Sequence, residues 1–144
     1  MINVLVVDDN GSIRKSLRNL IETADDIKIV DTATNGVEAV EKAHSHRPDV
    51  AVMDISMPFM DGIEATEHIR ECCRVTRVII LSGIKDPEYV RRALEVGAKG
   101  YVLKDEAASD LLEGIRTIHL GKHYFSPQIA EIAEKYLPRK AMKT

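Results

Sequence analysis

The sequence predicts a doubly wound α/β fold in which five parallel strands are covered by helices on both faces. Short apolar runs alternate with segments of helical periodicity along the chain, and this alternation favours a parallel sheet. Four of the runs also end in a charged or hydroxylic residue: residues 4–7 before Asp8, 50–53 before Asp54, 78–81 before Ser82 and 100–103 before Lys104. Parallel strands place such ends at one edge of the sheet, where open α/β sheets bind ligands.

Each of the first three strands is followed by a helix with one apolar face. After the first strand, Ile13, Leu17, Leu20, Ile21 and Ala24 recur at helical spacing. Residues 27–34 supply the second strand, Asn35-Gly36 marks a turn into a helix carrying Val37, Val40 and Ala43, and Pro48 ends that segment. The third strand leads to Asp54, and a turn-rich loop over residues 56–62 precedes a helix through Ile63, Thr66 and Ile69.

The second half repeats this order and then departs from it. The fourth strand leads to Ser82, and a helix from Asp86-Pro87 through Val90, Ala93 and Leu94 is closed by Gly97, where a left-handed cap is favoured. The fifth strand ends at Lys104, and the last core helix carries Leu111, Leu112, Ile115 and Ile118. Residues 1–121 are therefore predicted to form one domain.

Residues 122–144 are predicted to form a linker-like amphipathic helix and a basic tail. Ser126-Pro127 is a helix-start signal. Apolar residues then follow at helical spacing until Pro138 stops the run: Ile129, Ile132, Ala133, Tyr136 and Leu137. This helix lies outside the pattern of the five strands.

Composition and charge narrow the function classes. The 144 residues carry 20 Lys+Arg and 23 Asp+Glu, a net charge of −3. The only basic cluster is the short tail Arg139, Lys140 and Lys143, which argues against direct nucleic-acid binding. No apolar run is long enough to cross a membrane, and the chain enters its first strand directly instead of through a signal peptide. A cytoplasmic protein is expected.

Neither the cysteines nor the paired histidines predict a metal site. Cys72 and Cys73 are adjacent, so a disulfide between them is strained, and zinc would need two further ligands. The pair is interpreted as a small apolar residue at a helix end with a partly exposed neighbour. His44 and His46 precede Arg47-Pro48 and are interpreted as solvated loop residues.

The three carboxylates predict a magnesium site. Asp8, Asp9 and Asp54 would repel one another strongly at one sheet edge unless a cation lay between them. Hard oxygen ligands suit Mg²⁺. The three carboxylates and Lys104 sum to a charge of about −2, so one Mg²⁺ makes the site neutral, and a neutral site can accept a phosphoryl group.

Asp54 is the predicted nucleophile, because a carboxylate on the central strand can form an acyl phosphate. Mg²⁺, Lys104 and the Ser82 hydroxyl each provide a partner for one phosphoryl oxygen, and positioning with charge stabilisation is most of what phosphoryl transfer needs. Gly83 leaves room for the incoming donor. The sequence after the first strand, residues 8–12, matches neither a dinucleotide fingerprint nor a P-loop, which disfavours nucleotide binding.

These residues resemble the receiver domains of two-component response regulators. The matching segments are Val6-Val7-Asp8-Asp9, Met53-Asp54-Ile55-Ser56-Met57-Pro58, Met60-Asp61-Gly62, Leu81-Ser82-Gly83 and Gly97-Ala98-Lys99-Gly100-Tyr101-Val102-Leu103-Lys104. The resemblance covers residues 1 to about 121 and is greatest for the NarL/LuxR-type branch. It implies a flavodoxin-like sheet with strand order 2-1-3-4-5.

The resemblance also implies a role for each site position. Asp54 is expected to take a phosphoryl group from a sensor histidine kinase. Asp9, Asp54 and the Ser56 main-chain carbonyl are expected to bind Mg²⁺, with Asp8 acting through water. Ser82 and Lys104 are expected to hold the phosphoryl oxygens. In this family the hydroxyl residue moves toward the phosphate while an aromatic side chain turns inward, which makes Ser82 and Tyr101 the expected switch pair.

Two positions depart from the family pattern. Phe59 stands where many relatives have glycine, which places an apolar ring beside the entrance to the site. Asp105 replaces the proline that often follows the lysine through a cis bond in relatives. We expect a cis Lys104–Asp105 bond, although a cis bond without proline costs about 2.5–4 kcal/mol.

The predicted function is a phosphorylation-dependent switch that catalyses only its own phosphotransfer and dephosphorylation and controls an output domain or partner, as in transcription regulation. The NarL/LuxR-type branch normally continues through a linker helix into a DNA-binding domain. Since this chain stops at Thr144, either a truncated protein or a stand-alone receiver in a phosphorelay is expected. Association into a homodimer through helix faces is also expected.

Two other functions remain open. An aspartate-nucleophile phosphatase of the dehalogenase type also uses Asp, Ser or Thr, Lys and Mg²⁺. That class usually has a second acid two positions after the nucleophile, where this chain has Ser56, and often a cap insertion, which is not found. An interaction module with a vestigial site is disfavoured because every site position holds a competent residue type.

Overall fold

The computed structural model describes residues 1–137, which fold around one parallel sheet. Its strands are β1 (Ile2–Val7), β2 (Ile27–Ala33), β3 (Val50–Met53), β4 (Arg77–Ser82), β5 (Gly100–Leu103) and β6 (Tyr124–Phe125). Its helices are α1 (Gly11–Ile21), α2 (Gly36–His46), α3 (Gly62–Cys72), α4 (Pro87–Glu95), α5 (Ala107–His119) and α6 (Pro127–Ala133), with a 3₁₀ turn, η1, at Lys104–Glu106.

The strand order is β2-β1-β3-β4-β5-β6, and each neighbouring pair is parallel. The predicted order of the first five strands is confirmed. The sixth strand was not predicted, because the two residues Tyr124 and Phe125 are too short a run to show a strand pattern. They pair with Gly100 and Tyr101, so that β6 covers the edge of β5.

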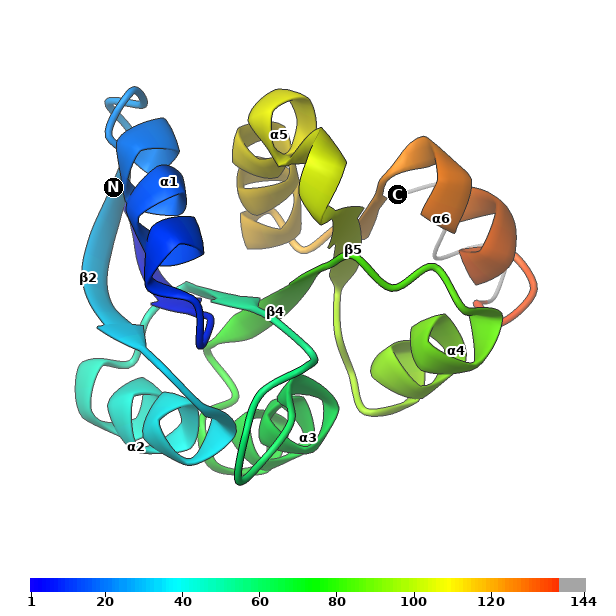
Figure 1. The fold of residues 1–144 in the computed structure, drawn as a ribbon, viewed down its shortest axis with the longest axis horizontal. Helices are drawn as coiled ribbons and strands as arrows, with labels where there is room; N and C mark the ends of the chain where they lie inside the picture. The colour runs from blue at the N-terminus through cyan, green and yellow to red at the C-terminus, as the bar shows by residue number, and fades with distance from the viewer. Residues whose placement is uncertain (138–144) are drawn as a thin grey trace.

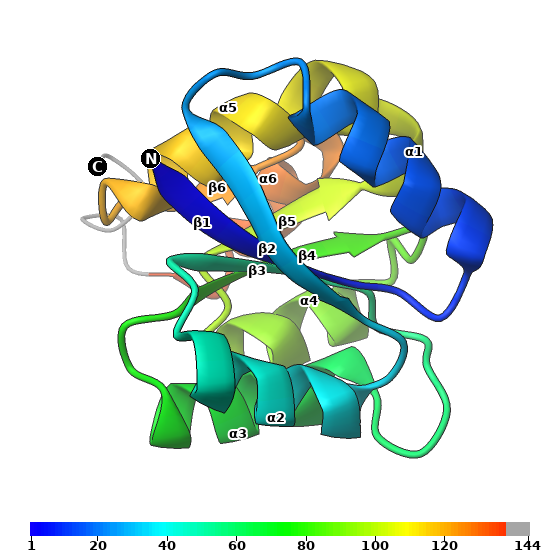
Figure 2. The ribbon, with the colours of Figure 1, turned by 90° about the vertical axis from the view of Figure 1, so that its left-hand side faces the viewer.

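Helices cover both faces of the sheet. Figure 2 shows α1 and α5 on one side and α2, α3 and α4 on the other. Side chains alternate between the two faces along each strand: Leu5 and Val7 belong to the core under α2, α3 and α4, and Val4 and Val6 to the core under α1 and α5. The strands are consequently buried on both sides, as expected for a parallel sheet.

Helix α6 lies beside α4 and beyond β5 (Figure 1). Ile129 and Ala133 on its inner face are fully buried. The helix is shorter than the predicted segment, because it ends at Ala133 and residues 134–136 continue as turns. The predicted stop at Pro138 and the basic tail lie outside the described residues.

Capping side chains set the beginnings of the helices that leave the carboxyl edge of the sheet. Asn10, Asn35, Asp61 and Asp86 each accept a hydrogen bond from a backbone N–H in the first turn of the helix that follows. Such caps satisfy amide groups that have no partner inside the helix. The capped turns allow α1, α2 and α4 to begin within a few residues of the strand ends, while α3 begins after the longer loop that follows β3.

Two expectations about α2 were wrong. His44 and His46 lie in its last turn and not in a loop, and His46 Nε2 lies 3.0 Å from Asp31 Oδ2. The helix continues to His46 because Arg47, in the left-handed conformation, ends it there. Val37 is exposed, since Ala39 and Ala43 form the buried face together with Gly36.

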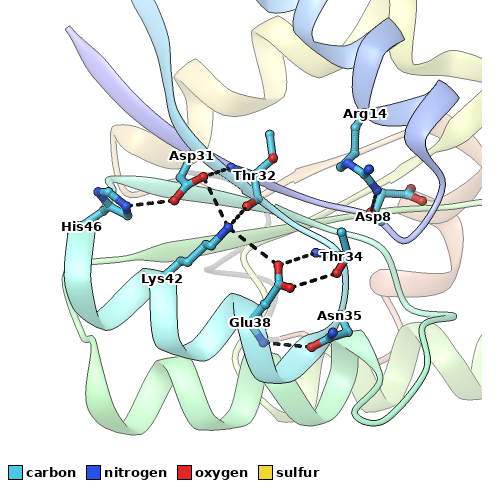
Figure 3. A network of polar contacts seen from close by, with 9 residues as sticks. All are labelled: Asp8, Arg14, Asp31, Thr32, Thr34, Asn35, Glu38, Lys42 and His46. Atoms are coloured by element: carbon cyan, nitrogen blue, oxygen red, sulfur yellow. Dashed lines mark hydrogen bonds and ion pairs between the residues drawn. The ribbon is translucent and has the colours of Figure 1, made fainter.

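A polar network joins α2 to β2 (Figure 3). Glu38 accepts hydrogen bonds from the backbone N–H and the hydroxyl of Thr34, while Asn35 accepts one from the Glu38 N–H. Lys42 is paired with Asp31 and with Glu38. These partly exposed contacts fix the direction in which α2 leaves the sheet.

The cysteines are as expected: Cys72, the last residue of α3, is exposed, Cys73 is buried, and both are free thiols. Within residues 1–137, no helix is long and apolar enough to span a membrane.

Candidate functional site

Three carboxylates meet at the carboxyl ends of the central strands. Asp8 directly follows β1 and Asp54 directly follows β3, and the two strands are paired so that Val7 lies opposite Met53. Main-chain hydrogen bonds fix both residues, from Asp8 N to Ala33 O at 3.1 Å and from Asp54 N to Val7 O at 3.0 Å. Carboxylate oxygens of Asp8, Asp9 and Asp54 lie within 4.8 Å of one another, as the strand ends predicted.

Lys104 places an ammonium group among these carboxylates. It follows β5 as the first residue of η1. Its Nζ lies 3.1 Å from Asp8 Oδ2 and 3.4 Å from Asp54 Oδ1. The lysine therefore bridges the two buried acids, while the carboxylate of Asp9 is exposed.

Backbone amides orient the two buried acids. The Asn10 N–H donates to Asp8 Oδ1 at 2.9 Å, and the Ile55 N–H donates to Asp54 Oδ1 at 2.8 Å. Arg14, on α1, donates to the Asp8 carbonyl at 2.7 Å (Figure 3). Each carboxylate thus has one oxygen held by its own loop.

Burial acts on the pKa values of Asp54 and Lys104 in opposite directions, yet both pKa values lie above the ordinary ones. Burial raises the pKa of Asp54, the negative charge of Asp8 raises it further, and Lys104 only partly offsets the two. Burial by itself would lower the pKa of Lys104, but its hydrogen bond to Asp8 and the charges of Asp54 and Asp8 outweigh burial and raise it. The site therefore holds more negative charge than one lysine can neutralise.

Replacing Asp54 by asparagine is expected to stabilise the metal-free protein at neutral pH by about 1 kcal/mol. The pKa of Asp54 is higher in the folded protein than in the unfolded chain, so stability is lost as pH rises from the ordinary value of 3.8 through the folded pKa. Asparagine does not ionise, and its carbonyl still accepts from Ile55. Urea denaturation in a chelator should show the gain at neutral pH and a smaller difference below the ordinary value.

The control for this substitution is Asp25→Asn, which removes a charge from an exposed position and should leave stability nearly unchanged. A metal-free Asp54→Asn protein less stable than the wild type at neutral pH would mean that attraction to Lys104 dominates over burial and repulsion.

Ser82 and Tyr101 lie together, next to the acidic cluster. Ser82 is the last residue of β4, and its hydroxyl accepts a hydrogen bond from Ile84 N at 3.1 Å. The Tyr101 side chain is fully buried, and its hydroxyl donates to Ile84 O at 2.7 Å. Burial raises the pKa of Tyr101 to about 12, although its hydrogen bond with Ser82 acts to lower it. Ser82 and Tyr101 are thus both hydrogen-bonded to Ile84, the first through its N–H and the second through its carbonyl.

The loop between β3 and α3 forms one side of the site and exposes Ser56 and Phe59. Phe59 has a backbone φ of 69° and is 89% exposed. A residue with a Cβ is strained in this left-handed region. Glycine, which the family resemblance leads one to expect at this position, would adopt this backbone conformation without strain. The exposed Phe59 ring makes no buried contact that would offset the strain.

Replacing Phe59 by glycine is expected to raise the free energy of unfolding by about 0.5–1 kcal/mol, because glycine removes the strain of the positive φ and no buried contact is lost. Phe59→Ala is the matched control, since alanine removes the exposed ring and keeps the strained Cβ. Chemical denaturation should leave the alanine variant close to the wild type. Equal stabilisation by alanine and glycine would show that the ring, and not the backbone, is unfavourable.

The expectation of a cis Lys104–Asp105 bond was wrong, because every peptide bond in residues 1–137 is trans. Lys104, Asp105 and Glu106 form the turn η1, and the Ala107 N–H donates to the Lys104 carbonyl. Asp105 has an ordinary backbone N–H, and for such residues the trans form is strongly favoured over the cis form. The turn η1 therefore continues into α5 through trans peptide bonds.

Two glycines support the site without contributing a side chain. A Cβ on Gly62 would overlap the Asp54 carbonyl oxygen and lie 2.8 Å from the Asp54 carbonyl carbon. A Cβ on Gly36 would also clash with the Met60 carbonyl oxygen, to which the Gly36 N–H donates at 3.0 Å. The sequence shows Gly62 only as part of a motif, and no local pattern reveals that the space it leaves is occupied by the backbone of Asp54.

The strand order and the acidic cluster beside a lysine define a receiver domain. The family model of the response regulator receiver domain matches residues 4–116, and the chain belongs to this family. Receiver domains are typically non-enzymatic signalling modules, and they imply a histidine kinase as partner.

Sequence relatives place the chain among NarL/LuxR-family regulators. It is 34% identical over 144 residues to the transcriptional regulatory protein LnrK of Bacillus subtilis (strain 168), covering 99% of this chain and 66% of that protein. It is 37% identical over 129 residues to the oxygen regulatory protein NreC of Staphylococcus carnosus (strain TM300), covering 89% of this chain and 59% of that protein. The chain thus spans between 59% and 66% of the length of these two relatives.

Solved structures agree with this placement. A LuxR-family two-component response regulator from Aurantimonas sp. SI85-9A1 superposes with a TM-score of 0.88 at 34% identity, over 94% of this chain and 97% of that one. The signal receiver domain of the response regulator NarL from Mycobacterium tuberculosis gives a TM-score of 0.81 at 30% identity, over 84% of this chain and 98% of that one.

Proposed function

We propose that this protein is a phosphorylation-dependent switch in which Asp54 accepts a phosphoryl group from a phosphohistidine of a sensor histidine kinase. The observation that carries the proposal is the position of Asp54, buried at 5% exposure between the like charge of Asp8 and the ammonium group of Lys104. A carboxylate oxygen of Asp54 attacks phosphorus as the P–N bond of the donor breaks. The electron pair remains on the departing imidazole, which takes a proton from solvent.

Mg²⁺ is the proposed cofactor, and the residues present fit it. The donor atoms are carboxylate oxygens within 4.8 Å of one another, and Mg²⁺ prefers such hard oxygen ligands, at about 2.0–2.1 Å each. Asp9, Asp54 and the Ser56 carbonyl would hold the ion, with Asp8 acting through water. The ion supplies positive charge to the transferring phosphoryl oxygens.

Ser82 and Lys104 are the proposed partners of the other two phosphoryl oxygens. Lys104 Nζ already lies 3.4 Å from Asp54 Oδ1, so it needs little movement to contact an oxygen of a phosphoryl group on Asp54. The Ser82 hydroxyl accepts from the Ile84 N–H, and its own O–H can donate to the phosphoryl group at the same time. A movement of Ser82 toward the phosphoryl group would bias the loop after β4, which is the two-state element of the proposed switch.

The proposed output is control of transcription, in line with the printed names of relatives such as the transcriptional regulatory protein LnrK. In this proposal the receiver function resides in residues 1–121, and residues 122–144 transmit its state to an output domain, a partner or a second copy of the chain.

Acetyl phosphate tests the proposal directly. The protein is incubated with acetyl phosphate and Mg²⁺, and intact mass is measured over time. We expect one phosphoryl adduct in the wild type, no adduct when Mg²⁺ is chelated, and no adduct in Asp54→Ala. The exposed Asp25→Ala variant is the control and should be phosphorylated like the wild type.

Other results would contradict the proposal in distinguishable ways. Repeated turnover of phosphomonoesters without an adduct would indicate an aspartate-nucleophile phosphatase. No reaction at any Mg²⁺ concentration would indicate a vestigial site, and an adduct that persists in Asp54→Ala would place the phosphoryl group on another residue.

A further inference from the structure

The segment that follows α5 is hydrogen-bonded to the strand that precedes Lys104. β6 pairs with β5, and the contacts continue at Ser126, which comes directly after β6. The Ser126 N–H donates to the Tyr101 carbonyl at 3.1 Å. The Ser126 hydroxyl accepts a hydrogen bond from the Leu103 N–H at 3.0 Å. One residue thus contacts the main chain on both sides of Val102.

The Ser126 hydroxyl does not have the usual role of a serine at this position. Ser126 is the N-cap residue of α6, where a serine side chain normally accepts from an amide of its own helix. Here its side chain makes no cap hydrogen bond and accepts from Leu103 instead. Both Ser126 and Leu103 are fully buried. Without this hydroxyl, a buried N–H directly before Lys104 would lose its acceptor.

Ser126 also anchors a helix that packs on the core beside the switch pair. Ile129 of α6 belongs to the same buried cluster as Tyr101, Val90 and Ala93. The last two are the buried residues of α4, against which α6 packs (Figure 1). The buried faces of α4 and α6 and the Tyr101 side chain therefore belong to one hydrophobic core.

The contacts of Ser126 lead in two short steps to the acidic site. Tyr101, whose carbonyl accepts from Ser126, donates through its side chain to Ile84, the residue that also donates to Ser82. Leu103, whose N–H donates to Ser126, is followed by Lys104, which bridges Asp8 and Asp54. A displacement of Ser126 would alter the main chain that carries both side chains.

We propose that Ser126 is a positioning residue for Lys104 and Tyr101, and that it couples the docking of α6 to phosphoryl transfer at Asp54. This inference rests on the proposed phosphorylation of Asp54. Coupling between two sites is reciprocal. Docked α6 holds Lys104 where it stabilises phosphorylated Asp54, so phosphorylation in turn strengthens the docking of α6. Holding Lys104 in place also speeds phosphorylation, because the ammonium group is already at the phosphoryl oxygens when transfer begins.

The first test measures phosphorylation of Ser126→Ala by acetyl phosphate, followed by intact mass. At saturating acetyl phosphate, we expect its rate constant to be at least fivefold lower than that of the wild type. The Mg²⁺ concentration for half-maximal rate should be unchanged, because the carboxylates are untouched. Ser126→Thr retains the hydroxyl and should recover most of the rate. Ser45→Ala, at an exposed serine of α2, should behave like the wild type.

The second test needs no substitution and therefore does not depend on how the variants fold. Amide hydrogen exchange is compared in the wild type before and after phosphorylation. We expect exchange at Leu103 and in α6 to change severalfold, while the buried amides of α1 stay as they were. A merely structural Ser126 would lower the melting temperature without this response.

The results separate the two proposals. No adduct on the wild type would refute the proposed function, and the coupling with it. A phosphorylated wild type whose α6 amides exchange unchanged, together with Ser126→Ala reacting at the wild-type rate, would refute the coupling alone. A slow Ser126→Ala that Ser126→Thr restores, with altered exchange in α6, would support it.

Discussion

Replacing Gly62 by alanine is expected to lower the free energy of unfolding by about 3 kcal/mol or more and to abolish phosphorylation of Asp54. The new Cβ would overlap the Asp54 carbonyl oxygen and lie 2.9 Å from Met53 Cγ. Backbone atoms cannot rotate away as a side-chain end can. Either α3 moves outward or the end of β3 moves, and the second displaces the proposed phosphoacceptor.

A hydrogen bond to the segment after β3 makes an outward movement of α3 costly. The Gly62 N–H donates to the Ile55 carbonyl at 2.9 Å. Chemical denaturation measures the loss of stability, and intact mass after acetyl phosphate treatment measures the loss of phosphorylation.

Gly83→Ala is the matched control, because a Cβ at Gly83 would meet no atom within 4 Å. It should leave stability unchanged or slightly higher, since alanine restricts the unfolded chain. A Gly62→Ala protein as stable as Gly83→Ala and as reactive as the wild type would show that the loop yields easily, contrary to the argument from close approach.

Replacing Lys104 by alanine is expected to preserve the fold and to impair the switch. The change removes the ammonium group that bridges Asp8 and Asp54, leaving the two buried carboxylates to repel each other. Removing one partner of a buried pair costs about 3–5 kcal/mol, but the Lys104 side chain is 28% exposed, so we expect about 2 kcal/mol. Phosphorylation should be slow because one phosphoryl oxygen loses its partner.

The pH dependence of this loss has a definite sign. Without Lys104 the pKa of Asp54 rises further, so the variant loses additional stability as pH rises from the ordinary Asp range, near 3.8, to neutrality. The deficit should be largest at neutral pH in a chelator, smaller in acid, and partly restored by Mg²⁺, which binds the ionised carboxylates. Urea denaturation at several pH values, with and without Mg²⁺, measures all three.

Lys85→Ala is the control, because it removes the same charge from an exposed position in the loop after β4. It should unfold like the wild type at every pH. A Lys104→Ala protein without a cooperative unfolding transition would instead make Lys104 a structural residue, and a deficit that grew in acid would contradict the assigned sign.

The sequence by itself determined the membership of the acidic site, and its resemblance to receiver domains implied the strand order that the structure confirms. Four apolar runs ended in Asp8, Asp54, Ser82 and Lys104, and parallel pairing requires such ends to meet at one edge. Apolar periodicity and start signals such as Asn35-Gly36 and Asp86-Pro87 are local, and they placed the first five helices close to where they lie. Local signals sufficed because each unit of strand and helix buries its own apolar face.

The tertiary structure alone decided which groups touch. The closeness of Gly62 to the Asp54 carbonyl, the trans bond after Lys104, and the hydrogen bond from Leu103 to Ser126 all join atoms whose relation depends on how packed elements meet. β6 has only two residues, and its place follows from the open edge of β5, not from any pattern of its own. Local periodicity records which face of an element is buried, and only packing determines what lies against that face.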